Sequence, residues 1–198
     1  MPPAIRTCLI ALSLTFFVMG GYYRVQSQRA GERLNRTKEG WPLLIGIRLM
    51  GFVMLGSTAV WLSKPSLFTW AAWPVPMIVQ WTGVVGFAFA VSWLLWMFHT
   101  LGRNLTDTVV VRRDAYLVTN GPYGLVRNPM YTGILMVGAA LGLALGTWLV
   151  PVAAVGMFGL LATRLRREEK YLVERFGDEY LNYMKCVGRF FPRIWQDE

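Results

Sequence analysis

The amino-acid sequence predicts an all-α integral membrane protein with about five transmembrane helices, a cytoplasmic loop before the fourth and a C-terminal amphipathic helix. Hydrophobic residues make up 55% of the 198 residues, and the mean hydropathy is +0.40. They lie in four or five blocks, each approaching the roughly 20 residues that a helix needs to cross a bilayer. A soluble helical bundle is the alternative, and it is disfavoured because the blocks hold too few polar positions to give each helix a polar, solvent-facing side.

The 20 Lys and Arg residues outnumber the 11 Asp and Glu residues, which gives a formal net charge of +9. The basic residues cluster beside the apolar blocks, as expected for segments that face the cytoplasm and anionic lipids. Nucleic acid is not expected as a partner, because no basic run is interleaved with aromatic residues. One His and two Cys do not supply the usual ligand sets of a metal site, so we expect no bound metal.

Residues 1–100 are expected to form an N-terminal region of three transmembrane helices. The first apolar block covers residues 7–23. Arg6 before it is also typical of a signal peptide, but no A-x-A-like cleavage site follows, which favours a retained helix. The second and third blocks cover residues 41–62 and 74–98.

One basic residue lies inside an apolar block. Arg48 is in the first third of the second block, where an unpaired charge in lipid is costly. Its long side chain either reaches the near interface or faces a polar cavity between helices.

Residues 101–198 are expected to combine the cytoplasmic loop, a transmembrane hairpin and the tail helices. The hairpin consists of two apolar blocks, residues 130–149 and 150–163, and the second block is short for a span. Small residues at four-residue spacing let two helices approach closely in lipid. One such stripe lies in the first arm of the hairpin: Gly138, Gly142 and Gly146.

The charged tail from Arg164 onward is predicted to be helical with one break. An apolar stripe recurs at every fourth position of this otherwise polar segment: Leu172, Phe176 and Tyr180. Gly177 followed by Asp178 and Glu179 is typical of the end of one helix and the start of the next. We therefore expect two helical pieces that meet at a bend.

The distribution of basic residues predicts the orientation. Of the 20 Lys and Arg residues, 17 lie in residues 24–40, residues 99–127 and the tail from residue 164. These segments share one side of the membrane if the chain crosses it five times. The positive-inside rule then places the loop and the tail in the cytoplasm and the N-terminus outside. Cys8 and Cys186 fall on opposite sides, so no disulfide between them is expected.

The segment GPYGLVRNPMYTG, residues 121–133, lies between the polar loop and the fourth apolar block. Pro122 and Pro129 fix their own φ and disfavour helical geometry at Gly121 and Asn128. This predicts a rigid, non-helical approach and a helix that begins at or just after Pro129. Such a segment either holds a ligand or simply starts a helix.

Three charged residues near the membrane each have two interpretations. Arg164 and Glu168 are spaced i, i+4 and share a helix face. They form either a solvated ion pair or a site in which each has its own role. The order Arg before Glu is less favourable for helix support, which favours the second interpretation. Arg127 is either a topology signal or an anchor for a phosphate group.

Three patterns in the C-terminal half resemble a known family. LGRNLTDTVVV, LVTNGPYGLVRNPMYTG and RLRREEKYLVERFGDEYLNYMKCVGRFFP occur in this order between residues 101 and 192. They resemble the isoprenylcysteine carboxyl methyltransferase family and its bacterial relatives, which belong with the membrane phospholipid methyltransferases and NnrU-like proteins. The resemblance implies an integral membrane enzyme that transfers a methyl group from S-adenosylmethionine, with residues 101–198 as its catalytic region. It also implies that a Rossmann fold is absent, and the chain has no G-x-G-x-x-G motif after a strand.

The resemblance further implies which residues form the site. The residues that would bind the cofactor are Ala115, Tyr116, Leu117, Val118, Tyr123, Asn128, Pro129, Met130, Tyr131 and Glu168. Arg164 would face the acceptor substrate, and Arg164 with Glu168 would form the catalytic pair. Eukaryotic members commonly have His where this chain has Asn128. An acid–base role is not carried over to this position, because Asn does not titrate near neutral pH.

These residue types suit methyl transfer. The reaction is a direct displacement, for which holding donor and acceptor in line supplies a large share of the rate. The ring faces of Tyr123 or Tyr131 would attract the cationic sulfur of the cofactor, and Glu168 would bind its ammonium group or ribose hydroxyls. Arg164 would hold a carboxylate acceptor, such as an isoprenylcysteine, by two parallel hydrogen bonds.

Other acceptors and functions remain open from the sequence alone. The acceptor is a lipophilic or small carboxylate, a small thiol or a phospholipid amine, and the lipid bilayer is the expected partner. Membrane sterol reductases share the C-terminal pattern and bind NADPH, but they have many more spans. A scaffold or transport subunit is the non-enzymatic alternative, and transport is disfavoured because no acidic residue lies within an apolar block. The expected location is a bacterial inner membrane.

Overall fold

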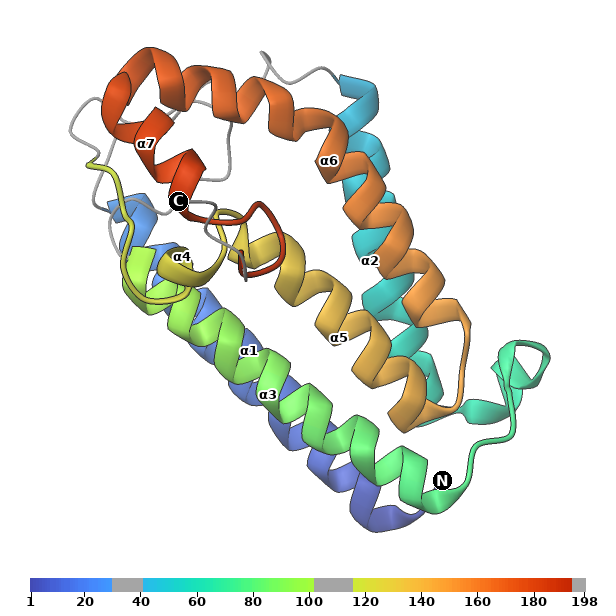
Figure 1. Cartoon of the computed structure of the whole chain (residues 1–198). Helices are drawn as coiled ribbons and strands as arrows, with labels where there is room; N and C mark the ends of the chain where they lie inside the picture. Colours follow the sequence, from blue (N-terminus) through green and yellow to red (C-terminus); the bar gives the residue numbers. More distant parts are fainter. Residues whose placement is uncertain (30–40, 102–115, 194–198) are drawn as a thin grey trace.

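The computed structural model describes residues 1–29, 41–101 and 116–193, which are drawn in colour in Figure 1. The described residues form helices joined by turns, and isolated β-bridges connect distant segments. In chain order the helices are α1 (Pro3–Arg29), α2 (Trp41–Ser63), the 3-10 helix η2 (Pro65–Ala71), α3 (Met77–Leu101), α4 (Pro122–Leu125), α5 (Pro129–Leu145), α6 (Leu149–Phe176) and α7 (Asp178–Cys186). The predicted all-α class is confirmed.

Four helices in the described part of the chain are long and apolar enough to cross a membrane: α1, α2, α3 and α6. α5 is also apolar but has 17 residues. At 1.5 Å per residue its length is about 26 Å. The hydrocarbon core of a bilayer is about 30 Å thick, so α5 falls at the lower limit for a span. The structure is therefore close to the five membrane helices that the sequence predicts.

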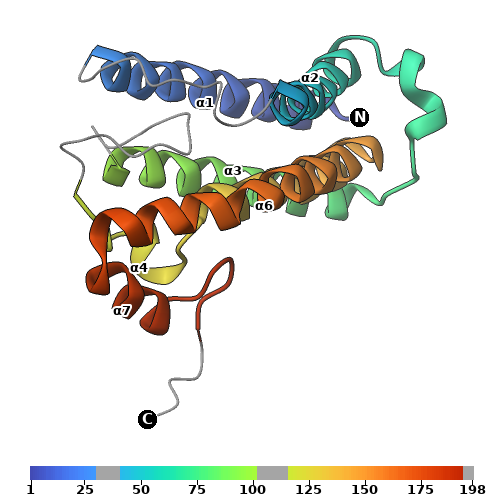
Figure 2. The ribbon, with the colours of Figure 1, turned by 90° about the horizontal axis from the view of Figure 1, so that it is seen from above.

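Figure 1 shows α1 and α3 side by side, α5 between α3 and α6, and α2 beside α6. Figure 2 places α1 and α2 in one layer, α3 and α6 in the next, and α4 and α7 beyond them. Side-chain contacts support this order. Phe98 of α3 packs against Gly20 of α1, and Leu160 of α6 packs against Gly46 of α2.

The two ends of the helix bundle differ in character. At one end the turn before α6 is tied to η2, because Thr147 Oγ1 donates a hydrogen bond of 3.0 Å to the carbonyl of Ala71. At the other end lie the last turns of α1 and α3, where the Tyr23 hydroxyl is 3.3 Å from His99 Nδ1. The start of α5 and the charged half of α6 lie at this second end, which we call the charged end. Residues 121–133 and the tail thus lie at the same end, in agreement with their predicted placement on one side.

Two apolar clusters hold the bundle together. The larger one joins α1, α3, α5 and the start of α6, and its most buried members include Ile5, Leu9, Phe87, Val91, Leu141, Leu145 and Val150. The smaller one lies toward the charged end. It consists of Tyr131, Leu161 and Leu165 with the partly buried Ile47, Met130, Ile134, Met157, Phe158 and Phe190. The smaller cluster supports the residues described below.

Glycines set the spacing between the central helices. A Cβ atom on Gly138 or Gly142 of α5 would lie 2.2 Å or 2.8 Å from side-chain atoms of α6. The predicted close approach along this stripe is confirmed at these two positions. On the other side of α5, a Cβ atom on Gly83 of α3 would lie 2.3 Å from the backbone nitrogen of Ala144.

Several predicted boundaries are wrong, because helical backbone does not end where apolar side chains end. α1 continues through polar residues on both sides of the predicted block 7–23. α3 begins at Met77, after the prolines that open the predicted block 74–98. α5 ends at Leu145 rather than at residue 149, because Gly146 adopts a left-handed conformation with φ +66° and caps the helix.

The predicted short return arm, residues 150–163, is the first half of one continuous helix. α6 runs without interruption from Leu149 to Phe176. No Pro or Gly occurs between Thr163 and Gly177, and the Arg, Lys, Glu and Leu residues there are good helix formers. Figure 1 shows this half of α6 extending across the charged end and leading into α7.

The bend predicted at Gly177 is confirmed. Gly177 has φ +56° and separates α6 from α7, and Asp178 and Glu179 occupy the first turn of α7. Negative charge at a helix N-terminus is favourable. The predicted apolar stripe is divided by this bend, because Tyr180 lies on α7 whereas Leu172 and Phe176 lie on α6.

Two further expectations concern single residues. Arg48 is exposed on the outer surface of α2, which favours extension toward the interface over a polar cavity. Cys8 and Cys186 are both free thiols, as expected.

Candidate active site at the charged end

The approach to α5 is set by Gly121 and Asn128. Gly121 has φ +58°, and a Cβ atom there would lie 2.6 Å from Thr100 Oγ1 of α3, so only glycine fits. Asn128 is also outside helical geometry, and α5 begins at Pro129 as predicted. The prediction of a wholly non-helical approach is wrong, because Pro122–Leu125 forms one helical turn, α4. Proline is well suited to the first position of that turn.

The start of α5 is held by a hydrogen bond from α3. Trp93 Nε1 donates a hydrogen bond of 2.9 Å to the carbonyl of Pro129. Pro129 is fully buried. This contact fixes the first turn of α5 against α3. It thereby also fixes the position of Tyr131, which lies two residues after Pro129.

Glu168 of α6 is held by two residues that the resemblance singled out. The Tyr131 hydroxyl donates to Glu168 Oε2 at 2.9 Å, and Arg164 Nε donates to Glu168 Oε1 at 2.5 Å. Tyr131 and Arg164 are 2% and 8% exposed, whereas the Glu168 side chain is 18% exposed. Arg164 and Glu168 therefore form a largely buried ion pair rather than two unconnected groups. Residues 121–133, which we call the proline-rich segment, and the charged tail thus each contribute a hydrogen-bond donor to the Glu168 carboxylate.

Tyr123 belongs to the same group of residues. Its backbone carbonyl accepts a hydrogen bond of 2.6 Å from the Tyr183 hydroxyl of α7. Burial is the main cause that raises the pKa of Tyr123, followed by the neighbouring Tyr183 and the negative charge of Glu168. The phenol therefore stays protonated, and it lies within electrostatic reach of Glu168.

The remaining predicted cofactor residues are placed differently. Pro129 is buried at the start of α5, Met130 packs into the smaller apolar cluster, and the side-chain nitrogen of Asn128 donates to the backbone carbonyl of Arg189 at 3.1 Å. Of the segment before α4, Tyr116 is mostly exposed, Leu117 is half-buried and Val118 is buried. Ala115 lies outside the described residues.

Residues 187–193, which we call the terminal segment, return from α7 to the start of α5. The backbone N–H of Arg127 donates to the carbonyl of Gly188 at 2.8 Å, and that of Asn128 donates to the carbonyl of Arg189 at 3.1 Å. Thr132 Oγ1 donates to the carbonyl of Phe190 at 2.9 Å. Residues 187–192 end the third pattern quoted above, but none of them was named as a site residue, because the segment has no helical period.

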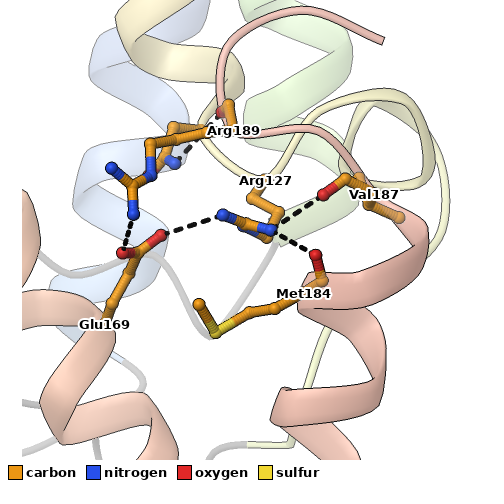
Figure 3. Close-up of polar contacts among 6 residues, drawn as sticks. Arg127, Glu169, Met184, Val187 and Arg189 are labelled. Atoms are coloured by element: carbon orange, nitrogen blue, oxygen red, sulfur yellow. Dashed lines mark hydrogen bonds and ion pairs between the residues drawn. The ribbon is translucent and has the colours of Figure 1, made fainter. Parts of the chain in front are cut away.

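A three-residue ion cluster, Arg127–Glu169–Arg189, connects the same elements (Figure 3). Glu169 Oε1 lies 3.3 Å from an Arg127 guanidinium nitrogen, and Glu169 Oε2 lies 2.7 Å from one of Arg189. The other terminal nitrogen of Arg127 donates to the carbonyls of Met184 and Val187 at 2.7 and 2.9 Å. Arg127 is thus an internal structural anchor in this structure. Its Nε is buried and has no partner among the described residues.

The sequence held a signal for Glu169 that was overlooked. Leu161, Leu165 and Glu169 recur at every fourth position, and all three are buried. Residues at this spacing share one face of a helix. Glu169 therefore continues the inward apolar face of α6, where a carboxylate needs a partner.

Aromatic rings pack around Tyr131, the hydrogen-bond partner of Glu168. The ring of Phe190 lies 5.9 Å from the ring of Tyr131 and 4.9 Å from the ring of Phe158. Aromatic pairs at these separations attract one another. The site thus combines a carboxylate, an arginine and phenol groups beside an apolar surface. Within the described residues no cluster of His, Cys, Asp and Glu has the size needed to hold a metal ion.

Comparison with known proteins places this arrangement in context. The chain is 30% identical over 140 residues to a protein-S-isoprenylcysteine O-methyltransferase of Dictyostelium discoideum, covering 68% of this chain and 55% of that protein. It is 34% identical over 98 residues to protein-S-isoprenylcysteine O-methyltransferase B of Arabidopsis thaliana, covering 48% and 50%. It is 38% identical over 81 residues to methanethiol S-methyltransferase of Pseudomonas deceptionensis, covering 36% and 27%. The chain spans about half the length of the first two relatives.

The model of the phospholipid methyltransferase family matches residues 78–179, just over half of the chain. The matched region runs from α3 to the first turn of α7, so it contains Tyr123, Tyr131, Arg164 and Glu168. The resemblance to membrane methyltransferases of the isoprenylcysteine type is confirmed by the relatives that share it. The chain therefore belongs to the phospholipid methyltransferase family of integral membrane proteins.

Proposed function

We propose that this protein is an S-adenosylmethionine-dependent membrane methyltransferase that methylates the carboxylate of an isoprenylcysteine-like or other lipophilic or small acceptor. One observation carries the proposal. Glu168 is held jointly by Tyr131 of the proline-rich segment and by Arg164 of α6, at 2.9 and 2.5 Å. Two segments far apart in sequence thus build one polar centre beside an apolar wall.

The donor set suits S-adenosylmethionine. Glu168 is partly exposed and offers a carboxylate to an ammonium group or to ribose hydroxyls. The Tyr123 hydroxyl makes no hydrogen bond to another described residue, and its phenol ring can face a cation. The Tyr131 hydroxyl donates to Glu168 and holds that carboxylate in place. Asn128, Pro129 and Met130 would act mainly through their backbone, because their side chains are engaged elsewhere.

When bound, the cofactor supplies an activated methyl group on a cationic sulfur. The contribution of the protein is then to hold donor and acceptor in line and to exclude water. Burial of Tyr131 and Arg164 restricts their movement, and Phe190 of the terminal segment packs against Tyr131. Preorganised charges in such a site act more strongly than they would in water.

Arg164 would orient the acceptor. Its guanidinium donates from Nε to Glu168. A carboxylate acceptor would bind to the same guanidinium, which shares its charge between acceptor and Glu168. The two residues of the catalytic pair therefore share one ion pair but have different partners, the acceptor for Arg164 and the cofactor for Glu168.

We infer that residues 101–198 form the catalytic region and residues 1–100 a membrane anchor that also shapes the apolar side. The site would face the cytoplasm of a bacterial inner membrane, with the N-terminus outside. The positions of 17 of the 20 basic residues support this orientation. Cytosolic S-adenosylmethionine would then have direct access to the charged end.

Binding and turnover of the purified protein in detergent test the proposal. Isothermal calorimetry should show binding of S-adenosylhomocysteine and no binding of NADPH. Glu168→Gln should weaken cofactor binding about tenfold or more, because a hydrogen bond to a charged group contributes about 1.5–3 kcal/mol. Tyr131→Phe should weaken it about fivefold. Arg164→Ala should spare the cofactor but lower turnover.

The matched control is Glu174→Gln, which removes a carboxylate from an exposed ion pair on the same helix and should change nothing. A labelled-methyl assay over a prenylcysteine, a small thiol and a phospholipid amine identifies the acceptor. The thiol must be included among the acceptors tested, because the chain is similar to a methanethiol S-methyltransferase. Binding of NADPH, or wild-type cofactor affinity in both Glu168→Gln and Tyr131→Phe, would contradict the proposal.

A further inference from the structure

Two adjacent carboxylates on α6 face different partners. Glu168 contacts Tyr131 and Arg164, whereas Glu169 contacts Arg127 and Arg189. Successive residues of an α-helix point about 100° apart, so one helix can serve both groups. The proposed chemistry uses Glu168 and leaves Glu169 without a role.

We propose that Glu169 is a positioning residue, which holds Arg127 and Arg189 so that the terminal segment is pressed onto the start of α5. This inference rests on the proposed methyl transfer, because it assigns Glu169 to the placement of Tyr131 and Glu168 for that reaction. Glu169 is 7% exposed. A buried carboxylate needs paired charges to be tolerated there.

The two arms of the ion cluster are not equivalent. The side chains of Arg127 and Glu169 are 8% and 9% exposed, and Arg127 is also fixed by two carbonyls of the α7 end. The Arg189 side chain is 44% exposed. Figure 3 shows that each oxygen of the Glu169 carboxylate contacts one of the two arginines. The Arg127 arm is therefore internal to the fold, whereas the Arg189 arm adds a side-chain contact from the terminal segment to the backbone hydrogen bonds that also hold it.

The position of the terminal segment is transmitted to the site through Phe190. Its carbonyl accepts from Thr132 at 2.9 Å, and its ring packs 5.9 Å from the ring of Tyr131. Tyr131 in turn donates to Glu168. Loss of the Arg189 contact with Glu169 would therefore loosen the packing of Phe190 against Tyr131, although neither residue of the proposed catalytic pair is changed.

A purely structural role for the cluster makes a different prediction. If it only stabilised the fold, its loss would lower the unfolding temperature and the fraction of active protein, with KM and kcat per folded molecule unchanged. A positioning role changes the kinetic constants of protein that is still folded. A misplacement of about 1 Å lowers a rate up to about a hundredfold.

Arg189→Ala is the decisive variant, because Glu169 keeps its pairing with Arg127. Arg189→Lys retains the charge and serves as the conservative variant. Glu174→Gln is the matched control, since its partner Lys170 is 3.8 Å away and both side chains are more than half exposed. Hydrogen exchange followed by mass spectrometry reports attachment of the terminal segment without any reaction, because the amides of Arg127 and Asn128 donate to Gly188 and Arg189.

In Arg189→Ala we expect faster exchange at the amides of residues 127 and 128, and a loss of kcat or a rise in KM of about tenfold or more. The Lys variant should recover most of both effects, and Glu174→Gln should match the wild type. Unchanged exchange, or faster exchange with wild-type kinetic constants per folded molecule, overturns the inference. A wild type that binds no cofactor and transfers no methyl group refutes the proposed function and with it the positioning role, while the exchange result still decides whether Arg189 attaches the segment.

Discussion

Three tyrosines on α4 and α7 have hydroxyl groups that are kept protonated by burial. The pKa values of Tyr123 and Tyr180 are raised, with burial as the largest cause. Burial also raises the pKa of Tyr183 to about 12, against a smaller lowering effect of Arg127. Tyr183 donates to the carbonyl of Tyr123 at 2.6 Å. A phenolate could not make this hydrogen bond, so the contact depends on the proton.

The contact should therefore weaken at alkaline pH. In the unfolded chain Tyr183 ionises near its ordinary pKa of about 10, whereas in the folded protein it holds its proton to about pH 12. Between these values the unfolded state binds fewer protons, so the free energy of unfolding falls as pH rises. Below about pH 10 the stabilisation is complete. Tyr183→Phe should be less stable than the wild type at pH 8 by about 1 kcal/mol, with a shallower loss of stability from pH 10 upward.

Thermal unfolding in detergent between pH 8 and pH 11.5 checks this expectation. Tyr171→Phe is the control, because Tyr171 is exposed on α6, and its pH profile should follow the wild type. Tyr123 and Tyr180 remain in the Tyr183→Phe protein, so some pH dependence persists. Identical slopes for Tyr183→Phe and the wild type would show that the Tyr183 proton does not contribute.

The sequence predicted part of the site and missed the rest for a physical reason. Tyr123, Tyr131, Arg164 and Glu168 were named from motifs, and the structure brings them together. Their proposed roles stay predictions. The ion cluster of Glu169 was missed because its arginine partners are 42 residues before and 20 residues after it. Such pairing depends on the tertiary fold and leaves no local period.

The α5–α6 hairpin shows how glycine sets the distance between two membrane helices. Lipid gives no hydrophobic drive for association, so close packing of backbone is the main attraction. Gly138 faces Ala154 so closely that a Cβ atom would be 2.2 Å from the Ala154 Cβ. The position of α6 relative to α5, and hence of Glu168 relative to Tyr131, depends on this contact.

Gly138→Ala should push α5 and α6 apart and destabilise the protein by about 1–3 kcal/mol, the usual range for overpacking. Gly159→Ala is the matched control. Nothing lies within 4 Å of a Cβ atom at Gly159 of α6, and alanine favours a helix by up to about 1 kcal/mol over glycine. Its unfolding temperature should stay equal or rise.

The double variant Gly138→Ala, Ala154→Gly restores the space and should recover most of the lost stability. This recovery would be the coupling expected of two residues in direct contact. If Gly138→Ala unfolds at the temperature of Gly159→Ala, the two helices are not held at the distance described here.

Helices were predicted better than their ends. Apolar block length located the four long apolar helices and the shorter α5, and Gly177 located the bend. The continuity of α6 was missed because hydropathy changes at Arg164 whereas helix propensity does not. A membrane boundary and a helix boundary are separate properties, since a helix can leave the bilayer without ending. In α6 the charged residues begin at Arg164, whereas the helix continues to Phe176.

The whole molecule concentrates its polar chemistry at one end. The last turns of α1 and α3, the start of α5, the second half of α6, α7 and the terminal segment meet there, whereas η2 and the turn before α6 close the other end (Figure 1). Four long helices and the shorter α5 separate the two ends. For the proposed function, the charged end must face the cytosol, so that a soluble cofactor can reach Glu168.

Two thiols at opposite ends of the bundle test that orientation. Native Cys186 lies exposed at the end of α7, and Ser66 lies exposed in η2. The first protein carries Cys8→Ser and keeps Cys186. The second carries Cys8→Ser, Cys186→Ser and Ser66→Cys. Both proteins are expressed in a bacterial inner membrane. Each has one thiol among the described residues, at the charged end in the first protein and at the opposite end in the second.

A membrane-impermeant maleimide should label the Ser66→Cys protein in intact spheroplasts and the Cys186 protein only after permeabilisation. The physical reason is the excess of Lys and Arg at the charged end, which resists translocation. The reverse pattern would place Glu168 outside, away from cytosolic S-adenosylmethionine, and would contradict the proposed function. Labelling of both thiols in intact spheroplasts would instead show that the chain crosses the membrane an even number of times between Ser66 and Cys186, rather than three.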